Sequence, residues 1–259
     1  MNLGCIIQAR MDSTRLPGKV LKNLDSETSC LDFILNQLKN AIDKENIVIA
    51  TTKLGTDDKI ENFAKKNKIN FFRGESSNVL DRYYNCAKKF SMKNIIRITS
   101  DCPLIDPNII LKLIEIMNSD NFDYVSNVLT RTFPIGLDVE IFRFSALERA
   151  WKNANLPSEK EHVTPYIKKN PTMFKLHNYE NSIDKSNIRL TLDTAEDLDL
   201  IKTVVSRISS RPILFEEINK LFDKNPSLLL INGNIKHDGY EKSLREDKNF
   251  NNGTKIENE

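Results

Sequence analysis

The sequence has little net charge and no long apolar run, and both absences narrow what the protein can be. Its 259 residues include 38 lysines and arginines against 36 aspartates and glutamates, a formal net charge of +2. A balance this close to zero argues against a general nucleic-acid-binding or membrane-binding surface. No run approaches the roughly 20 apolar residues of a membrane span, and Arg10 interrupts the first apolar run too early for a signal peptide. We therefore expect a cytoplasmic protein.

Glycine is sparse, at 8 residues, and the familiar glycine-rich nucleotide motifs are absent. Neither GxxxxGK[ST] nor GxGxxG occurs, so a P-loop and a dinucleotide fingerprint are not indicated. The four cysteines form no CxxC pair, which favours reduced core thiols. Cys102 differs from the others because it lies beside Asp101. Hydrophobic residues make up 39% of the chain, enough for the core of one large domain.

Apolar runs alternate with amphipathic stretches through the first half of the chain. This βαβα rhythm predicts an α/β fold, with a parallel sheet that carries helices on both faces. The spacing of apolar residues predicts strands over 3–8, 46–51, 69–72 and 94–99, and helices over 30–42, from 56–58, from Asn78 and over 107–117.

The rhythm loosens after residue 124, which predicts a mixed, mainly parallel sheet with an inserted lid or dimerisation region at about 127–180. We expect one domain over residues 1–231, and a polar, disordered tail over 232–259 because few apolar residues follow Glu241. Further strands are predicted over 137–142, 173–178 and 188–192, and further helices over 145–153, 159–169, 194–207 and 213–222.

A cluster of cations follows the first predicted strand directly. Arg10, Arg15 and Lys19 are separated by the small or polar residues Ser13 and Thr14 and by a glycine. A strand that opens into a short loop with convergent cations and free backbone N–H groups suits a polyphosphate. The alternative is that these charges are ordinary solvated surface residues. The loop makes a nucleotide the first ligand to consider.

Two aspartates follow predicted strands. Asp101 ends the fourth strand and suits Mg²⁺, which takes one or two carboxylates together with phosphate oxygens and water. Asp101 could instead cap a turn. Asp193 is a second possible metal ligand, or with Thr194 and Asp197 part of a helix cap, which the spacing alone favours. Because ligands of parallel sheets lie beyond the carboxyl ends of the strands, Asp101 and the cationic loop are expected in one site.

Other polar residues are weaker candidates. Asp138 and Glu140 alternate along a predicted strand, so they share one face and could bind sugar hydroxyls, a metal or a cationic lid residue. A solvated edge strand is the equal alternative. His162 begins a predicted helix, where a lone histidine is more often structural than catalytic. Arg73 and Arg82 flank a loop-to-helix junction and could reach a phosphate or a base.

Together the motifs resemble the cytidylyltransferases that make CMP-activated acidic sugars, such as CMP-Kdo and CMP-sialic acid synthetases. They resemble in particular the SpsF branch, named for spore coat polysaccharide biosynthesis. The resemblance covers about residues 3 to 230 and implies a Rossmann-like GT-A nucleotidyltransferase fold and a homodimer. It rests on the segments 9–19, 73–84, 99–104, 136–140 and 161–166.

The resemblance also implies roles for individual residues. The loop cations cradle the triphosphate, Asp101 and Asp193 hold Mg²⁺, and Arg15, Lys19 and Asp101 carry the catalysis. The acceptor sugar is expected at Asp138, Glu140 and His162. The nucleotide site is expected to comprise Ala9, Arg10, Ser13, Thr14, Arg15, Lys19, Arg73, Arg82 and Ser100.

The predicted function is therefore a Mg²⁺-dependent cytidylyltransferase that transfers CMP from CTP to an acidic or amino sugar, for surface polysaccharide or glycan assembly. A sugar hydroxyl would attack the α-phosphorus and release pyrophosphate, chemistry that needs alignment and charge neutralisation more than a covalent nucleophile. Alternatives are a guanylyl- or uridylyltransferase acting on a sugar 1-phosphate, and a phosphonate cytidylyltransferase. A GT-A glycosyltransferase, and a nucleotide-binding module without activity, are less favoured.

Overall fold

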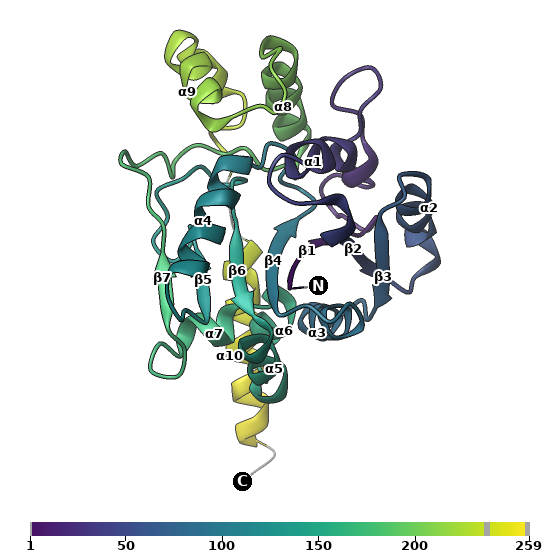
Figure 1. Ribbon diagram of the computed structural model, residues 1–259, viewed down its shortest axis with the longest axis vertical. Helices are drawn as coiled ribbons and strands as arrows, with labels where there is room; N and C mark the ends of the chain where they lie inside the picture. Colours follow the sequence, from purple (N-terminus) through teal and green to yellow (C-terminus); the bar gives the residue numbers. More distant parts are fainter. Residues whose placement is uncertain (1, 236–238, 257–259) are drawn as a thin grey trace.

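A single seven-stranded sheet runs through the computed structural model, which describes residues 2–235 and 239–256 (Figure 1). The strand order is β3-β2-β1-β4-β6-β5-β7. The strands are β1 (Leu3–Gln8), β2 (Ile47–Thr52), β3 (Asn70–Gly74), β4 (Asn94–Thr99), β5 (Tyr124–Ser126), β6 (Glu140–Arg143) and β7 (Leu176–Asn178).

The first four strands run parallel because a helix returns the chain after each of the first three. Their carboxyl ends therefore meet at one edge of the sheet. The prediction of a Rossmann-like α/β fold with a mixed, mainly parallel sheet is confirmed. The connecting helices are α1 (Cys30–Leu38), α2 (Asp58–Lys66) and α3 (Val79–Lys89), and α4 (Pro107–Ser119) follows β4.

Two apolar cores cover the two faces of the sheet. In β1, Cys5 and Ile7 join the core that α1, α4 and two later helices share, while Ile6 joins the core beneath α3. This division follows from the alternation of side chains along a strand. The later helices are α5 (Phe144–Asn153), α6 (Pro157–His162), α7 (Pro165–Lys169), α8 (Ala195–Arg207), α9 (Phe215–Lys224) and α10 (Gly239–Ile256).

The second half of the chain departs from three sequence predictions. The helix expected over 159–169 is divided into α6 and α7 at Val163, whose φ is +70°. Pro165 lies at the first position of α7 and has no N–H to donate to the preceding turn, so a continuous helix through it is disfavoured. The segment 188–192 is not a strand of the sheet but forms an isolated bridge from Arg189 to Ile135. The strand predicted over 137–142 begins only at Glu140.

The C-terminal segment also differs from its prediction. In place of the disordered tail predicted for 232–259, the described residues 239–256 form α10, which packs against α6. Figure 1 shows this helix in yellow beside α6 and α7. Polar composition did not reveal it because its buried contacts are made by Ser243 and Asp247, which are only 2% and 6% exposed. The domain limits at 231 and the lid at 127–180 stay predictions.

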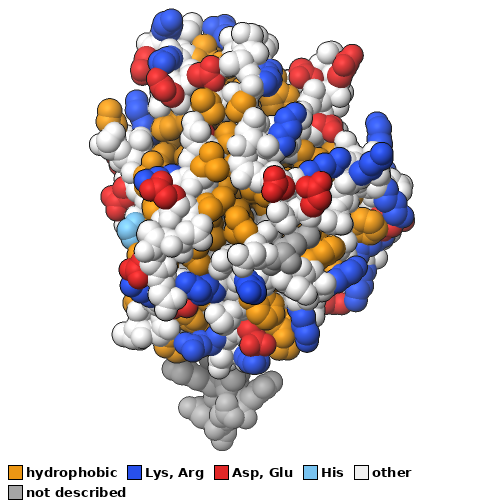
Figure 2. Space-filling view, viewed as in Figure 1, with side chains coloured by type: hydrophobic (Ala, Val, Ile, Leu, Met, Phe, Trp, Pro, Cys, Tyr) orange, Lys and Arg blue, Asp and Glu red, His pale blue; other side chains and the backbone are white. Residues whose placement is uncertain are grey.

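The charged residues are mixed over the face seen in Figure 2, where lysine and arginine lie among aspartate and glutamate. This distribution agrees with the small net charge. Within residues 2–235 and 239–256, none of the helices is long and apolar enough to cross a membrane.

Candidate active site

The loop after β1 is held in a defined shape by its own backbone. Gly18 adopts a φ of +68°, a conformation that glycine reaches readily, and its N–H donates to the Met11 carbonyl at 3.1 Å. At the start of the loop, the Met11 N–H donates to the Asp57 carboxylate at 2.7 Å. Together these bonds place Lys19 at the beginning of a short helical turn, Lys19–Leu21.

Asp57 is the residue that directly precedes α2, but its side chain does not cap that helix. Instead the Asp57 carboxylate is 1% exposed and accepts hydrogen bonds from the end of β2, at Thr52, and from Met11. The residue therefore positions the cationic loop on the sheet. The sequence carried no signal of this contact, because 46 residues separate Asp57 from Met11.

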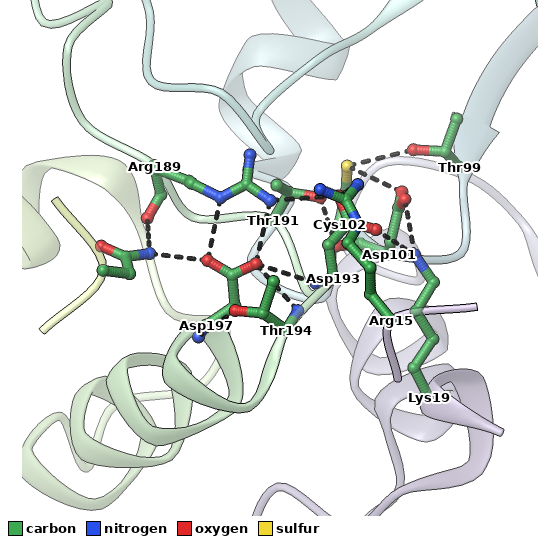
Figure 3. A network of polar contacts seen from close by, with 11 residues as sticks. Arg15, Lys19, Thr99, Asp101, Cys102, Arg189, Thr191, Asp193, Thr194 and Asp197 are labelled. Carbon is green, nitrogen blue, oxygen red and sulfur yellow. Dashed lines mark hydrogen bonds and ion pairs between the residues drawn. The ribbon is translucent and has the colours of Figure 1, made fainter. Parts of the chain in front are cut away.

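Lys19 joins the two aspartates that the sequence singled out (Figure 3). Its Nζ lies 3.0 Å from Asp101 Oδ2 and 2.5 Å from Asp193 Oδ1. Arg15 reaches Asp193 at 3.4 Å. The cationic loop, the segment with Asp101 and the segment with Asp193 are far apart in the sequence. They converge beyond the carboxyl ends of β1 and β4, as the sheet topology predicts.

The charges of this cluster stabilise one another. Burial by itself would raise the pKa of Asp101, but Lys19 and hydrogen bonds hold that pKa well below its usual range. Burial would lower the pKa of Lys19, and the two carboxylates raise it instead. At neutral pH the ammonium and the Asp101 carboxylate are therefore both charged. The arrangement is one of fixed charges, which suits binding and charge neutralisation.

Gly136 allows the segment that carries Asp193 to approach Asp101. Its φ is +104°, and a Cβ there would lie 2.5 Å from the Leu190 carbonyl carbon, so only glycine fits. The neighbouring backbone then joins the end of β4, where the Leu192 N–H donates to the Asp101 carbonyl at 2.7 Å. This contact fixes the two aspartates relative to each other.

A network of hydrogen bonds and ion pairs orients the Asp193 side chain (Figure 3). Arg189 donates to Asp193 Oδ2 at 3.1 Å and to both oxygens of Asp197 at 2.9 Å. Asn232 donates to Asp197 at 2.8 Å. Asp197 also accepts from the backbone N–H groups of Asp193 and Thr194, which confirms the predicted cap. Sequence reasoning missed Arg189 and Asn232, since neither belongs to a recognisable motif.

The remaining residues predicted near the nucleotide occupy several places. Ala9 is buried and its N–H donates to Ala50, and the Ser100 N–H donates to Gln8. These two residues fix the loop and the end of β4 to the sheet. Ser13 and Thr14 lie in the cationic loop, and Arg10 lines a cavity with Ser76 and Ser77.

The structure does not bring Arg73 and Arg82 to the aspartates. Arg73 is bound to Asp58 at 2.6 Å, to Glu61 at 2.8 Å and to backbone carbonyls at the end of β2. Arg82 is 2% exposed and donates to the Glu75 carbonyl at 2.9 Å. Arg73 therefore ties α2 to the end of β2, and Arg82 holds the segment after β3. These contacts do not support the hypothesis that the two arginines reach phosphate or base.

Of the three residues predicted at the acceptor, Glu140 is the one that the structure buries. It is 4% exposed and accepts from Arg97, Tyr124 and Thr164, each at 2.6 Å. These partners enclose its carboxylate, and because β6 begins at Glu140, Asp138 lies outside the strand.

Asp138 and His162 remain near the surface. Asp138 lies before β6 and forms a two-bond pair with Arg131 at 2.6 and 2.8 Å. His162 Nε2 lies 2.9 Å from the Ser243 hydroxyl of α10. Burial lowers the pKa of His162, so the ring is neutral at pH 7. Neither residue contacts the aspartate cluster through any bond found among the described residues.

The pair of aspartates fits a divalent cation. Asp101 Oδ2 and Asp193 Oδ1 both contact one cationic nitrogen, so they converge on a point that already holds a positive charge. Two carboxylates are the usual protein share of a Mg²⁺ site, which phosphate oxygens and water complete. Among the residues that the structure describes, no group of three or more possible metal ligands occurs. Burial raises the pKa of the neighbouring Cys102 thiol well above its usual value.

Comparison with known proteins assigns the chain to a family. A family model described as cytidylyltransferase matches residues 4–237, and the chain therefore belongs to the cytidylyltransferase family and is a nucleotidyltransferase. The chain is 34% identical to the spore coat polysaccharide biosynthesis protein SpsF of Bacillus subtilis over 238 residues, 85% of this chain and 94% of that protein.

Two further relatives agree with this assignment. A cytidylyltransferase structure from Leptospira borgpetersenii superposes with a TM-score of 0.85 and 39% identity, covering 92% of this chain and 100% of that one. The 3-deoxy-manno-octulosonate cytidylyltransferase of Rickettsia felis is 29% identical over 134 residues, 49% of this chain and 52% of that protein. The resemblance stated from the motifs is confirmed.

Proposed function

We propose that the protein is a Mg²⁺-dependent cytidylyltransferase that transfers CMP from CTP to an acidic or amino sugar and releases pyrophosphate. The observation that carries this proposal is the convergence of Lys19, Asp101 and Asp193 on one point, at 3.0 and 2.5 Å. Similarity to SpsF supports a role in surface polysaccharide or glycan biosynthesis. The resemblance further implies a homodimer, and the sequence predicts a cytoplasmic location.

The reaction needs positioning and neutralisation of charge. A sugar hydroxyl attacks the α-phosphorus, the bond from that phosphorus to the oxygen of the leaving pyrophosphate breaks, and the hydroxyl proton passes to solvent. In this proposal Lys19 and Arg15 bind the phosphates and hold them in line with the incoming hydroxyl. Ser13, Thr14 and backbone N–H groups of the loop complete the cradle. Donors fixed before the reaction stabilise the developing charge without reorganisation.

Asp101 and Asp193 would hold Mg²⁺, which supplies charge neutralisation on the phosphate oxygens when it is bound. In the ligand-free chain the Lys19 ammonium lies between the two carboxylates. When nucleotide binds, Lys19 would turn to the phosphates, because these offer more negative charge than the two carboxylates. Arg189 and Asp197 keep Asp193 in place during this exchange. Asp138 and His162 are proposed on the acceptor side.

The test is pyrophosphate release, measured with each of CTP, UTP, GTP and ATP, Mg²⁺ and a panel of acidic and amino sugars. We expect release with CTP, and at least a 10²-fold lower rate for Asp101→Asn, in line with the loss of one electrostatic contact at a transition state. Asp199→Asn on the exposed side of α8 is the matched control and should behave as wild type. Full activity of Asp101→Asn would remove this residue from the site.

A further inference from the structure

Two carboxylate oxygens that face each other in the candidate active site are bridged by a cation of the chain itself. Lys19 Nζ lies 3.0 Å from Asp101 Oδ2 and 2.5 Å from Asp193 Oδ1. The Lys19 side chain is 12% exposed, so both ion pairs form in a partly enclosed place. Figure 3 shows the ammonium joined to both aspartates. The position that suits a divalent cation is therefore the position that the ammonium fills.

The other oxygens of the two aspartates are held by different donors. Asp193 Oδ2 accepts from Arg189 at 3.1 Å and from Arg15 at 3.4 Å. The Cys102 thiol donates to Asp101 Oδ1 at 3.6 Å. Because none of these donors is Lys19, they orient the aspartates whether or not the ammonium is present. The two facing oxygens consequently keep their places when the ammonium leaves.

Lys19 combines a fixed backbone with a flexible side chain. Its N–H donates to the Leu16 carbonyl at 3.2 Å, and its carbonyl accepts from the Lys22 N–H at 3.1 Å. The four-carbon stem can carry the ammonium to another anion while the loop stays in place. Without such an anion, a divalent ion at the aspartates would leave the ammonium beside a like charge. Partial enclosure weakens the screening of that repulsion by water and salt.

We propose that Lys19 is a built-in substitute for the divalent cation and keeps the metal out until a polyphosphate binds. The triphosphate draws the ammonium away, and only then do Asp101 Oδ2 and Asp193 Oδ1 become available as metal ligands. The nucleotide therefore precedes or accompanies the metal, and the aspartates have little affinity for the metal alone. This inference rests on the proposed function, because it describes the regulation of the same site.

The test measures the binding of Mn²⁺ alone to the full-length chain, by electron paramagnetic resonance of the free ion. Mn²⁺ accepts the same oxygen ligands as Mg²⁺. Lys19→Met should bind Mn²⁺ more tightly than wild type by about tenfold or more, the effect of roughly 1.4 kcal/mol. Lys22→Met removes the same charge from a neighbouring, partly exposed position, and it is the matched control. Its Mn²⁺ affinity should stay within about twofold of wild type, a change of only ~0.4 kcal/mol.

Two further variants keep the result interpretable. Asp101→Asn, combined with Lys19→Met, should abolish the gain in affinity, which would place the bound Mn²⁺ at the aspartates. Lys19→Gln removes the charge but keeps a polar side chain, and it should gain affinity as well. The test therefore does not depend on the folding of one variant, and circular dichroism checks that each variant is folded.

Affinity for CTP should change in the opposite direction. Measured by calorimetry in the presence of EDTA, Lys19→Met should bind CTP about tenfold more weakly than wild type. A merely structural role of Lys19 would not raise the affinity for the metal while it lowers the affinity for the nucleotide.

The proposal is overturned if wild type binds Mn²⁺ alone as tightly as Lys19→Met does, or if Lys22→Met gains as much. It is also overturned if the gain survives Asp101→Asn, or if Lys19→Met binds CTP as wild type does. Failure of the proposed function would look different: the Mn²⁺ and CTP affinities would follow the prediction, yet no pairing of nucleotide and sugar would release pyrophosphate.

Discussion

A single ammonium group organises the candidate site at the residue scale. Lys19 neutralises two carboxylates that would otherwise repel each other in a partly enclosed place, where its side chain is 12% exposed. Removing one partner of such a cluster leaves uncompensated charge and is costly. Asp57 contributes in a less visible way, because its bond to the Met11 N–H fixes the loop that carries Lys19.

Glu140 provides a residue-scale prediction about pH. Burial alone would raise its pKa, but Lys168, Arg97 and the hydroxyls of Thr164 and Tyr124 lower that pKa to about 2. A folded-state pKa below the unfolded value of roughly 4.3 stabilises the protein above that pH. The contribution is lost as the pH falls toward the folded-state value.

Glu140→Gln should therefore lower the free energy of unfolding by about 3 kcal/mol at pH 7, the usual cost of breaking a buried ion pair. The difference from wild type should shrink as the pH falls from ~4.3 toward 2. Urea unfolding followed by circular dichroism at pH 7, 4 and 3 measures it. Glu115→Gln, in an exposed pair with Lys112, is the control. A difference that is equal at pH 7 and pH 3 would contradict the assignment.

At the element scale, the start of α8 joins helix capping to the site. Thr194 caps the helix by accepting from the Asp197 N–H at 3.3 Å. The fully buried Asp197 carboxylate accepts a hydrogen bond from the Thr194 N–H and another from Arg189. Arg189 in turn donates to Asp193. The same carboxylate therefore caps the start of α8 and helps to orient a proposed metal ligand.

These two roles predict different losses of stability. Thr194→Ala should cost about 1 kcal/mol, as for a lost N-cap. Asp197→Ala should cost ~3–5 kcal/mol, because it leaves the Arg189 guanidinium, only 5% exposed, without its main partner. Chemical denaturation of both variants gives the comparison, with Asp199→Asn expected within about 0.5 kcal/mol of wild type. Equal losses for Thr194→Ala and Asp197→Ala would mean that the Arg189 network adds nothing beyond the cap.

At the scale of the whole molecule, ligand binding should stabilise the fold. A ligand at 100 times its Kd adds about 2.7 kcal/mol to the free energy of unfolding. For a chain of this size that corresponds to roughly 5–10 °C in Tm. CTP with Mg²⁺ should produce this shift in a thermal melt, and Lys19→Met should lose most of it. Lys220→Gln, on the exposed face of α9, is the control. An undiminished shift in Lys19→Met would place the nucleotide elsewhere.

The sequence was most informative where structure is local. The four parallel strands, the helix starts at Asn78 and residue 107, the cap at Thr194, and the loop of Arg10 to Lys19 after β1 all lie where the patterns predict them. It says less where distant segments decide which partners a charged side chain meets. Arg73 and Arg82 carry the same charge as Lys19, yet each is held by neighbours that only the fold supplies.

The sequence by itself determined the βαβα order, and hence the edge at which Asp101 and the cationic loop must meet. Hydrophobic periodicity and capping are local properties, which is why they can be read from one chain. Only the tertiary structure decided that Asp193 joins this edge from outside the sheet, that Glu140 is buried, and that the polar C-terminal segment is a docked helix. Each of these depends on a partner far away in the chain, and single-chain patterns do not record such partners.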